Sequence, residues 1–359
     1  MKKYKIFFFD AHIGVFQEFS YLIKSICPPS VSLEGWLISN HSNLIGREQD
    51  HPCIINQQTW HHLNANMIES FQSEYDHILR ECDAFFVGYP SSFALIFEKY
   101  NKPVILLNCV RYDLPFCWTG DYGTLKMLHE ALFRMHTDER LAVVSNNLAD
   151  HDYFSLGNEK IPTFLIPTLG EYANLKYEDE SGELLVFSGE PIVTNYSERL
   201  IRKSSLGIFD SRELKRFSGI VHIPYEVSTM SMAEHYAGGF PLIFPSPDMG
   251  DDLRTFLQSS LQSNYWRHFG QSPPDYLDVA TKGDWQRWWL SRADFYHFFT
   301  EVNLISSIEE LLHMTQDNAT HRLRRPTTDH LLIRKQRIFG QWRVVLGKLG
   351  VPINPLITR

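Results

Sequence analysis

The chain has 359 residues, of which 43% are hydrophobic and 14% aromatic, and it carries a formal net charge of −8 with a pI near 6.0. This composition excludes an intrinsically disordered chain, and its acidic balance argues against a general nucleic-acid binder, since such proteins are usually basic. The sequence contains no run of about eighteen apolar residues, so no membrane span is predicted. The length predicts two domains, each large enough for a hydrophobic core of its own.

The start of the chain and its cysteines indicate the compartment. The first residues begin like a signal peptide, but the apolar run at 6–9 is short and stops at Asp10, which predicts a first strand instead. Five cysteines all lie in the first third, odd in number and without a Cys-x-x-Cys pair, which favours free thiols in a reducing cytoplasm. The sixteen histidines lack metal-ligand spacing, so neither a metal nor another cofactor is expected.

Strands and helices alternate through the first half of the chain, which is typical of a parallel, doubly wound sheet. Because ligands collect at the carboxyl ends of such strands, we expect the polar loops that follow them to converge on one edge. The predicted strands are 6–9, 84–87, 103–107, 141–144 and 164–166, with weaker candidates at 36–38 and 53–55. The predicted helices are 15–25, 68–81, 93–100 and 125–136.

The second half starts after an acidic, turn-rich linker at 178–182 and repeats the alternation. Its aromatic cluster at 285–299 has helical spacing, which favours core packing over a sugar-stacking platform. The two halves together predict an α/β chain with two Rossmann-like domains. The predicted strands are 184–187, 219–223 and 241–244, with a possible strand at 208–209. The predicted helices are 229–237, 252–261, 285–299, 307–314 and 329–349, the last with basic residues Arg334, Lys335, Arg337, Arg343 and Lys348.

The segment 219–246 carries the most specific pattern in the chain. Its first strand ends at Pro224, Ser228 offers an N-cap oxygen to the following helix, and Gly238 and Gly239 end that helix. The helix N-terminus presents backbone N–H groups and the positive end of the helix dipole above the strand ends. This arrangement suits a phosphate.

Two glutamates flank this helix start, Glu226 before it and Glu234 about two turns into it. A Glu, seven residues and a second Glu, flanked by Pro and followed by Gly-x-Pro and a hydrophobic strand, resembles the donor-binding motif of retaining glycosyltransferases of the two-domain GT-B type. The resemblance implies that Glu226 contacts the donor hexose and that Glu234 holds the nucleotide ribose. An amphipathic helix with a solvated glutamate is the alternative. The resemblance further implies that the donor diphosphate lies beside Ser188, Gly189, Ser228, Thr229, Met230 and Ser231.

The same resemblance implies a domain layout. It places an acceptor-side domain at 1–178 and a nucleotide-sugar-binding domain at 179–325, with a cleft between them. A carboxyl-terminal helix at 326–359 would cross back onto the first domain.

The sequence departs from the family pattern at the diphosphate. GT-B enzymes usually place an Arg and, a few residues on, a Lys after the first strands of the second domain, and no such pair follows Ser188. Each nearby basic residue is better explained as a solvated helix charge. The nearest substitutes are Arg199, Arg202, Lys203, Arg212 and Lys215.

Candidate catalytic residues in the first half follow the first strand. His12 is placed to bind a donor hydroxyl or to assist proton movement, and Asp10 would be the natural base if the reaction were inverting. Both are equally explained as structural groups of a tight loop, and Glu226 completes the catalytic set. Candidates for binding acceptor hydroxyls, with a plain turn as the alternative, are Tyr89, Arg111, Tyr112 and Asp113.

These features together predict a hexosyl- or pentosyltransferase. It would move a sugar from a UDP- or GDP-sugar to a hydroxyl of a glycan or glycoprotein, without a metal and with retention of configuration. Two alternatives stay open. One is a sugar-nucleotide epimerase or a phosphorylase on the same scaffold, and the other is a non-catalytic relative that binds glycans or partners, which the missing basic pair favours.

Four stretches resemble glycosyltransferases encoded by large DNA viruses of algae. They are the amino-terminal strand, the Pro-Tyr-Glu-x-Ser segment at 224–228, and the late segments 293–296 and 308–311. This resemblance implies an acceptor glycan on a viral coat protein and a location in the host cytoplasm.

Overall fold

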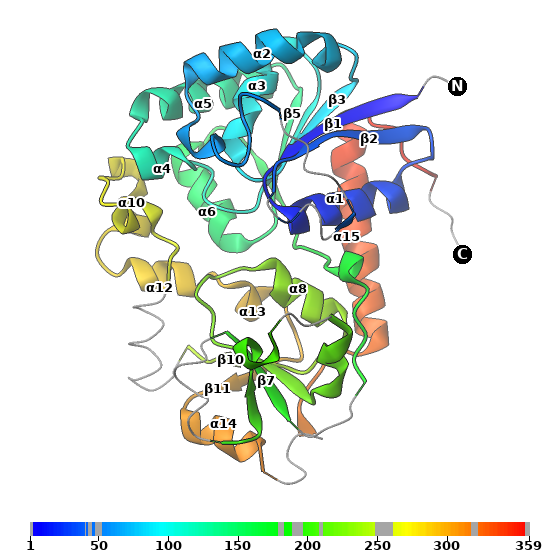
Figure 1. Cartoon of the computed structure of the whole chain (residues 1–359), viewed down its shortest axis with the longest axis vertical. Helices are drawn as coiled ribbons and strands as arrows, with labels where there is room; N and C mark the ends of the chain where they lie inside the picture. Colours follow the sequence, from blue (N-terminus) through cyan, green and yellow to red (C-terminus); the bar gives the residue numbers. More distant parts are fainter. Residues whose placement is uncertain are drawn as a thin grey trace. The chain divides into compact units, whose positions relative to one another are not determined.

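The computed structural model describes residues 3–39, 41, 45–46, 52–178, 183–188, 197–207, 211–247, 261–316 and 322–355, without the side chains of residues 211 and 212. The chain folds into two compact units, each with its own parallel sheet (Figure 1). Unit 1 comprises Met1–Pro167, Tyr265–Gly283 and Arg337–Arg359, and unit 2 comprises Thr168–Asn264 and Asp284–Gln336.

The sheet of unit 1 has six parallel strands in the order β2-β1-β3-β4-β5-β6. The chain runs from β1 to β2 on one side and then returns to β3 on the other, so the topological switch point lies between β1 and β3. Every residue of β3, β4 and β5 is buried, as expected of parallel strands covered on both faces. The strands are β1 (Tyr4–Asp10), β2 (Val31–Leu37), β3 (Ala84–Val87), β4 (Val104–Asn108), β5 (Leu141–Ser145) and β6 (Thr163–Leu165).

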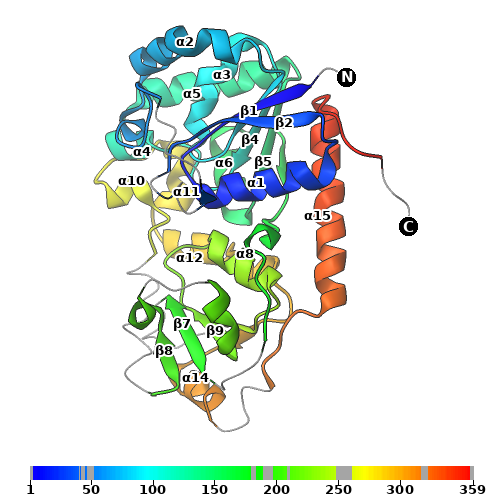
Figure 2. The same cartoon turned by 45° about the vertical axis from the view of Figure 1, so that its right-hand side comes forward.

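Helices cover both faces of this sheet (Figures 1 and 2). Phe19 of α1 stacks on Phe86 of β3, with 3.6 Å between ring centroids and 7° between ring planes. Such an aromatic pair holds the amphipathic helix against the sheet. On one face lie α2 (Ala65–Leu79), α3 (Ala94–Phe97) and α5 (Tyr122–Thr137), and on the other α1 (Ile13–Ile26) and α6 (Leu148–Gly157).

A segment from the second half of the chain, Tyr265–Gly283, belongs to unit 1, and we call it the excursion segment. It contains α10 (Tyr265–His268) and α11 (Asp278–Thr281). Trp266, 1% exposed, anchors it by donating from Nε1 to Oδ2 of Asp113 at 2.6 Å. Its ring also stacks on Tyr122, with 5.6 Å between centroids.

The sheet of unit 2 has five parallel strands in the order β11-β10-β9-β7-β8. Its first strand, β7, pairs with β8 on one side and β9 on the other, so the switch point of this unit lies between β7 and β9. The strands are β7 (Leu184–Ser188), β8 (Leu200–Arg202), β9 (Gly219–His222), β10 (Leu242–Pro245) and β11 (Asn303–Ile305).

Side chains of the unit 2 sheet alternate between two packed layers. On one face, aliphatic residues of β7, β9 and β10 pack with Leu311 of α14 (Ile308–Met314). On the other face, Phe244 of β10 stacks on Phe295 of α13 (Asp294–His297), with 4.6 Å between centroids. The unit also includes α12 (Trp285–Leu290), α8 (Met230–Ala237) and the first part of α15 (Thr328–Lys348), whose later part clusters with unit 1.

The predicted pair of parallel, doubly wound α/β sheets and the long carboxyl-terminal helix are confirmed. The predicted strand at 53–55 is wrong, because this apolar run forms bends whose Cys53 N–H is satisfied by the hydroxyl of Tyr75 at 2.8 Å. The predicted helix at 285–299 is two short helices, α12 and α13. The strand predicted at 208–209 and most of the helix predicted at 252–261 lie outside the described residues.

The domain ranges 1–178, 179–325 and 326–359, the cleft between the domains and the crossing of the last helix stay predictions. Within the described ranges, none of the helices combines the length and the apolar character needed to cross a membrane.

Candidate functional site

The switch point of unit 2 brings the ends of β7 and β9 together. Ser188 ends β7 and pairs with His222 across a β-bulge, and the N–H of Ile223 donates to the Ser188 carbonyl at 3.3 Å. The Ser188 hydroxyl is buried and has no hydrogen-bond partner among the described residues. A buried hydroxyl without a partner is costly, so this atom marks a place for a ligand or water. Gly189, predicted beside it, lies outside the described residues.

Glu226 lies in the loop between β9 and α8, and two distant segments hold this loop. Its Oε2 accepts from the hydroxyl of Ser263 at 2.8 Å, and its side chain is 7% exposed. The N–H of Asp294 donates to the Val227 carbonyl at 3.0 Å. The loop is therefore fixed on both sides of the carboxylate, which limits its freedom to reorient.

The cap of α8 lies one residue later than predicted. The hydroxyl oxygen of Thr229, not that of Ser228, accepts from the N–H of Met232 at 3.4 Å, and the helix begins at Met230. Ser228 instead donates to Oδ2 of Asp294 at 2.5 Å. The bond to Asp294 holds the Ser228 side chain towards that carboxylate, and the Thr229 oxygen takes the capping position instead. The N–H groups of Met230 and Ser231 have no acceptor within the helix, and N–H groups at such a position can bind an anion.

Glu234 lies on α8 and is half-buried. Its Oε1 accepts a short hydrogen bond from the hydroxyl of Tyr172, in the segment that follows β6. Burial raises the pKa of the Glu234 carboxyl, and the Tyr172 bond opposes that rise. The same segment packs closely on α8 through Gly170, where an added Cβ would lie 2.3 Å from the carbonyl oxygen of Ala233.

A buried pair of histidines, which the sequence analysis did not predict, links α8 to the end of β9. Nε2 of His222, at the end of β9, lies 3.1 Å from Nδ1 of His235 on α8. Phe187 and Phe244 enclose the two rings. Burial lowers the pKa of His235 to about 3 and that of His222 well below its usual value. Both imidazoles are therefore neutral at neutral pH, and one donates to the other.

The predicted basic substitutes separate into two groups. Arg199 donates to the Thr315 carbonyl at 3.0 Å, and Lys215 pairs with Glu178 at 2.9 Å, so both are engaged in structural contacts. Lys203 follows β8, and its Nζ lies 4.0 Å from the ring centroid of Phe187, the residue before Ser188. Lys203 is thus a cation beside the end of β7. Arg202 is exposed, and the side chain of Arg212 lies outside the described residues.

At the switch point of unit 1, Asp10 is fully buried at the end of β1. Its Oδ1 accepts from the N–H groups of His12 at 2.7 Å and Tyr89 at 3.3 Å, while its Oδ2 finds no hydrogen-bond partner in the described parts of the chain. A Cβ on Gly88 would lie 1.9 Å from that Oδ2, so the backbone after β3 covers it. Burial raises the pKa of Asp10 well above its usual value. This placement favours a structural role over that of a base.

His12 caps α1. Its Nδ1 accepts from the N–H groups of Gly14 at 3.2 Å and Val15 at 3.4 Å. Because Nδ1 is an acceptor here, the neutral ring carries its proton on Nε2. In this state the exposed ring offers a hydrogen-bond donor to a ligand oxygen and not a base.

Of the predicted acceptor-binding residues, only Tyr89 retains substantial exposure. Arg111 is 3% exposed, with its NH1 3.6 Å from Oδ1 of Asp150. Asp113 is fully buried and accepts from Tyr153 at 2.8 Å as well as from Trp266, and burial raises its pKa to about 6. Tyr112 is also fully buried, with its hydroxyl 3.1 Å from Nε2 of His129. Their burial leaves these three no surface for an acceptor and favours a structural role.

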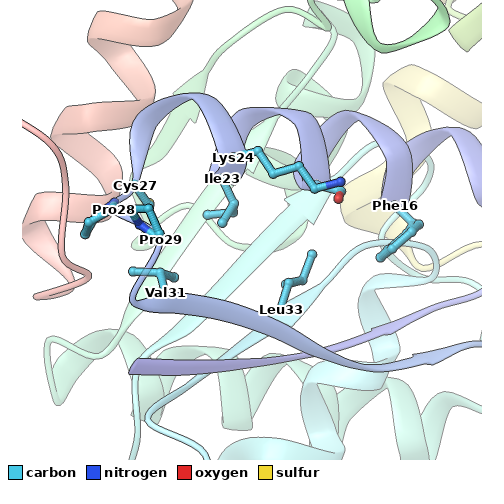
Figure 3. Close-up of a pocket in the computed structure, with 9 residues that line it drawn as sticks. Phe16, Ile23, Lys24, Cys27, Pro28, Pro29, Val31 and Leu33 are labelled. Carbon is cyan, nitrogen blue, oxygen red and sulfur yellow. The ribbon is translucent and has the colours of Figure 1, made fainter. Parts of the chain in front are cut away.

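A pocket of about 530 Å³ runs along α1 beside the edge strand β2 (Figure 3). Lys24 carries the only charge among the residues that line it, and the remaining lining is mostly apolar. Burial raises the pKa of the Cys27 thiol to about 11, so that group stays neutral. The pocket holds no set of catalytic side chains, and we assign it no role. Across the described parts of the chain, no three His, Cys, Asp or Glu side chains gather to hold a metal ion.

The structure therefore brings together Ser188, Glu226 and the first turn of α8 in unit 2, with Glu234 further along that helix. Sequence reasoning missed Ser263 and Asp294, which hold the loop from segments far along the chain. No local pattern marks either residue, because each acts through a contact set by the fold.

Comparisons with known proteins give similarity of fold only. No protein-family model matches the sequence, and no curated protein matches it. The chain is similar to CalG4, the calicheamicin glycosyltransferase, with 10% identity over 100% of both chains and a TM-score of 0.41. It is similar to the kitacinnamycin glycosyltransferase, with 10% identity over 96% of this chain and 98% of that one and a TM-score of 0.44. It is also similar to a UDP-N-acetylglucosamine 2-epimerase, with 11% identity over 80% of this chain and 94% of that one and a TM-score of 0.33. At these identities and TM-scores the likeness carries no argument about activity.

Proposed function

We propose that the chain is a glycosyltransferase that binds a nucleotide-diphosphate sugar in unit 2 and transfers the sugar to a glycan hydroxyl. The observation that carries the proposal is the junction of β9 and α8. There a capped helix N-terminus, a serine hydroxyl without a partner among the described residues, one buried glutamate and one half-buried glutamate lie at the switch point of a parallel sheet. Ligands of doubly wound sheets bind at this position.

Each part of the junction has a proposed role. The N–H groups of Met230 and Ser231 and the Ser188 hydroxyl bind the diphosphate, with Lys203 as the cation that replaces the missing basic pair. Glu234 accepts from the ribose hydroxyls, and Glu226 accepts from a hydroxyl of the sugar.

The reaction breaks the bond between the anomeric carbon and the diphosphate oxygen. A bond from the acceptor oxygen to that carbon forms, and the acceptor proton passes to the departing diphosphate. The helix dipole and Lys203 stabilise the charge that develops on the departing diphosphate, which is the chemistry this site supplies. We propose that no metal is needed, that the donor is a UDP- or GDP-sugar and that configuration is retained. A relation to glycosyltransferases encoded by viruses stays a prediction.

Melting temperature against UDP, GDP, CMP, ADP and dTDP tests the proposal. A ligand that binds only the folded state adds about 2.7 kcal/mol at about 100 times its Kd. We expect one nucleoside diphosphate to raise the midpoint, and its parent nucleoside to raise it much less, because the diphosphate contacts are lost. No shift with any of the five would contradict a donor site at this junction.

A further inference from the structure

Five aromatic rings form a continuous cluster at the carboxyl edge of the unit 1 sheet. Trp60 lies 5.4 Å from Tyr89 and 5.2 Å from Trp118, between ring centroids. Trp118 lies 5.2 Å from Phe269 and 6.1 Å from Tyr265. We call these five residues the aromatic platform.

The platform is assembled from four separate parts of the chain. Trp60 belongs to the connection after β2, Tyr89 to the loop after β3 and Trp118 to α4 (Phe116–Thr119), after β4. The excursion segment supplies the other two rings. Hydrogen bonds fix that segment in place, including one from Nε2 of Gln271 to the Trp118 carbonyl at 3.3 Å.

Several of these rings are not covered as core aromatics are. Phe269 is 45% exposed, and Tyr89, Trp118 and Tyr265 are half-buried, although Trp60 is 9% exposed. Neighbouring aromatic rings that keep part of their surface exposed are typical of a binding surface.

Buried polar atoms without partners lie in the same strand ends. Among the described residues they are the hydroxyls of Ser91 and Ser92 and Oδ1 of Asn108, and all three residues are at most 1% exposed. Nε1 of Trp118 is likewise buried without a partner. Buried polar atoms normally find a hydrogen-bond partner, so this edge has capacity for ligand hydroxyls or for waters that bridge to them.

We propose that the aromatic platform binds a neutral oligosaccharide, which is the acceptor of the proposed function. A pyranose ring presents one face of C–H bonds, which the negative face of an aromatic ring attracts, and a rim of hydroxyls. A purely apolar ligand would leave the polar atoms of this edge unsatisfied. A nucleic acid also stacks on aromatic rings, but the net charge of −8 disfavours a polyanion. The acceptor role rests on the proposed function, whereas binding by the platform does not.

The first test titrates the whole protein, without nucleotide, with cellohexaose, maltohexaose, mannohexaose and chitohexaose. Saturation-transfer NMR reports which sugar protons contact the protein, and tryptophan fluorescence gives the affinity. We expect at least one series to bind, with transfer concentrated on the C–H protons of one ring face. If none of the four binds, or if p-nitrophenol or oligo-dT binds in their place, the proposal is overturned.

Variants locate the binding. Phe269→Ala removes the most exposed ring and should weaken oligosaccharide binding about fivefold to tenfold, whereas Phe269→Tyr should restore it. Phe133→Ala is the control, because Phe133 is 44% exposed and lies on α5 outside the platform. Equal affinities for the Phe269→Ala and Phe133→Ala variants would place the binding elsewhere and overturn the proposal.

Nucleoside diphosphate affinity, measured on the same variants, separates this inference from the proposed function. It should not change with Phe269→Ala. Nucleotide binding without oligosaccharide binding would overturn the proposal for the aromatic platform and leave the proposed donor site intact. Oligosaccharide binding without nucleotide binding would do the reverse.

Discussion

Lowering the pH from 7.5 to 5.0 should loosen the junction that carries the donor site. His222 and His235 are buried and neutral, with pKa values lowered from the ordinary 6.5, that of His235 to about 3. Below pH 6.5 the unfolded chain takes up protons at these positions while the folded chain does not. Stability is therefore full above the unfolded pKa and is lost as pH falls towards the folded values.

The size of this loss follows from the pKa difference. At pH 5.0, about 1.5 units below the ordinary pKa, each histidine that stays neutral costs about 2 kcal/mol. The pair therefore costs about 4 kcal/mol, a large share of the 5–15 kcal/mol that typically stabilises a domain. The nearby charge of Lys203 lowers both pKa values further and so acts in the same direction.

Hydrogen exchange of peptides that cover β9 and α8, corrected for the intrinsic pH dependence of exchange, measures this effect locally. A local probe is needed because His129 in unit 1, with its pKa lowered to about 4, adds a similar pH dependence there. We expect the free energy of opening of α8 to fall by several kcal/mol between pH 7.5 and 5.0. In His235→Asn, which cannot titrate at that position, the fall should be about half as large.

An exposed histidine provides the control. His313→Gln, at an exposed position on α14, should leave the pH dependence of α8 unchanged. A free energy of opening that is the same at both pH values would refute the reasoning. So would the same fall in the wild type and in His235→Asn.

Two further predictions concern the same unit. Lys203→Met should weaken nucleoside diphosphate binding about tenfold, measured by calorimetry, with little effect on nucleoside binding, because a charge-assisted contact is lost. Lys215→Met, which loses the same charge, should have no effect. Equal losses of affinity in the two variants would show that Lys203 does not belong to the site. Gly170→Ala should lower the free energy of unfolding by about 2–4 kcal/mol in urea denaturation, because its φ is +80° and its Cβ would lie 2.3 Å from the Ala233 carbonyl oxygen. Gly239→Ala, with φ of +78° and with Cδ1 of Leu331, 4.0 Å away, as the nearest described atom to the added Cβ, should cost only about 1 kcal/mol, and a similar cost at both positions would disprove the close packing.

The sheet strands were the most predictable part of the fold. The strand at 84–87 matches its prediction residue for residue, because a fully buried parallel strand is a continuous apolar run bounded by polar residues. The strands β8 and β11 are three residues long, which is too short for any periodicity to identify them. The helix α6 has mixed polarity along its length and was missed for a similar reason.

The candidate site was predictable where one local segment makes it. The strand, loop and helix from Gly219 to Ala237 lie in sequence, so their capping residues and glutamates could be placed from spacing alone, apart from the one-residue error in the cap. The contacts of Glu226 with Ser263 and of Ser228 with Asp294 join residues 37 and 66 positions apart. Nothing in the local sequence at either end encodes such pairings.

The loop after β4 shows a different limit. Arg111 and Asp113 were predicted to bind acceptor hydroxyls, with a plain turn as the alternative, and either role would place them at the surface. Here the excursion segment covers them, and Trp266 donates directly to Asp113. The local sequence around Arg111 and Asp113 does not indicate that a distant segment returns to unit 1.

The central claim is tested most directly with the Glu234→Gln variant. Calorimetry would measure its affinity for the nucleoside diphosphate that the melting screen identifies. Gln still offers an oxygen to the Tyr172 hydroxyl, so the contact of α8 with that residue survives while the charge is lost. We predict an affinity at least about tenfold weaker, since a charge-assisted hydrogen bond worth about 1.5–3 kcal/mol is removed, and no change for the exposed control Glu198→Gln. An unchanged affinity in Glu234→Gln would contradict the assignment of Glu234 to the ribose and with it the donor site at the start of α8.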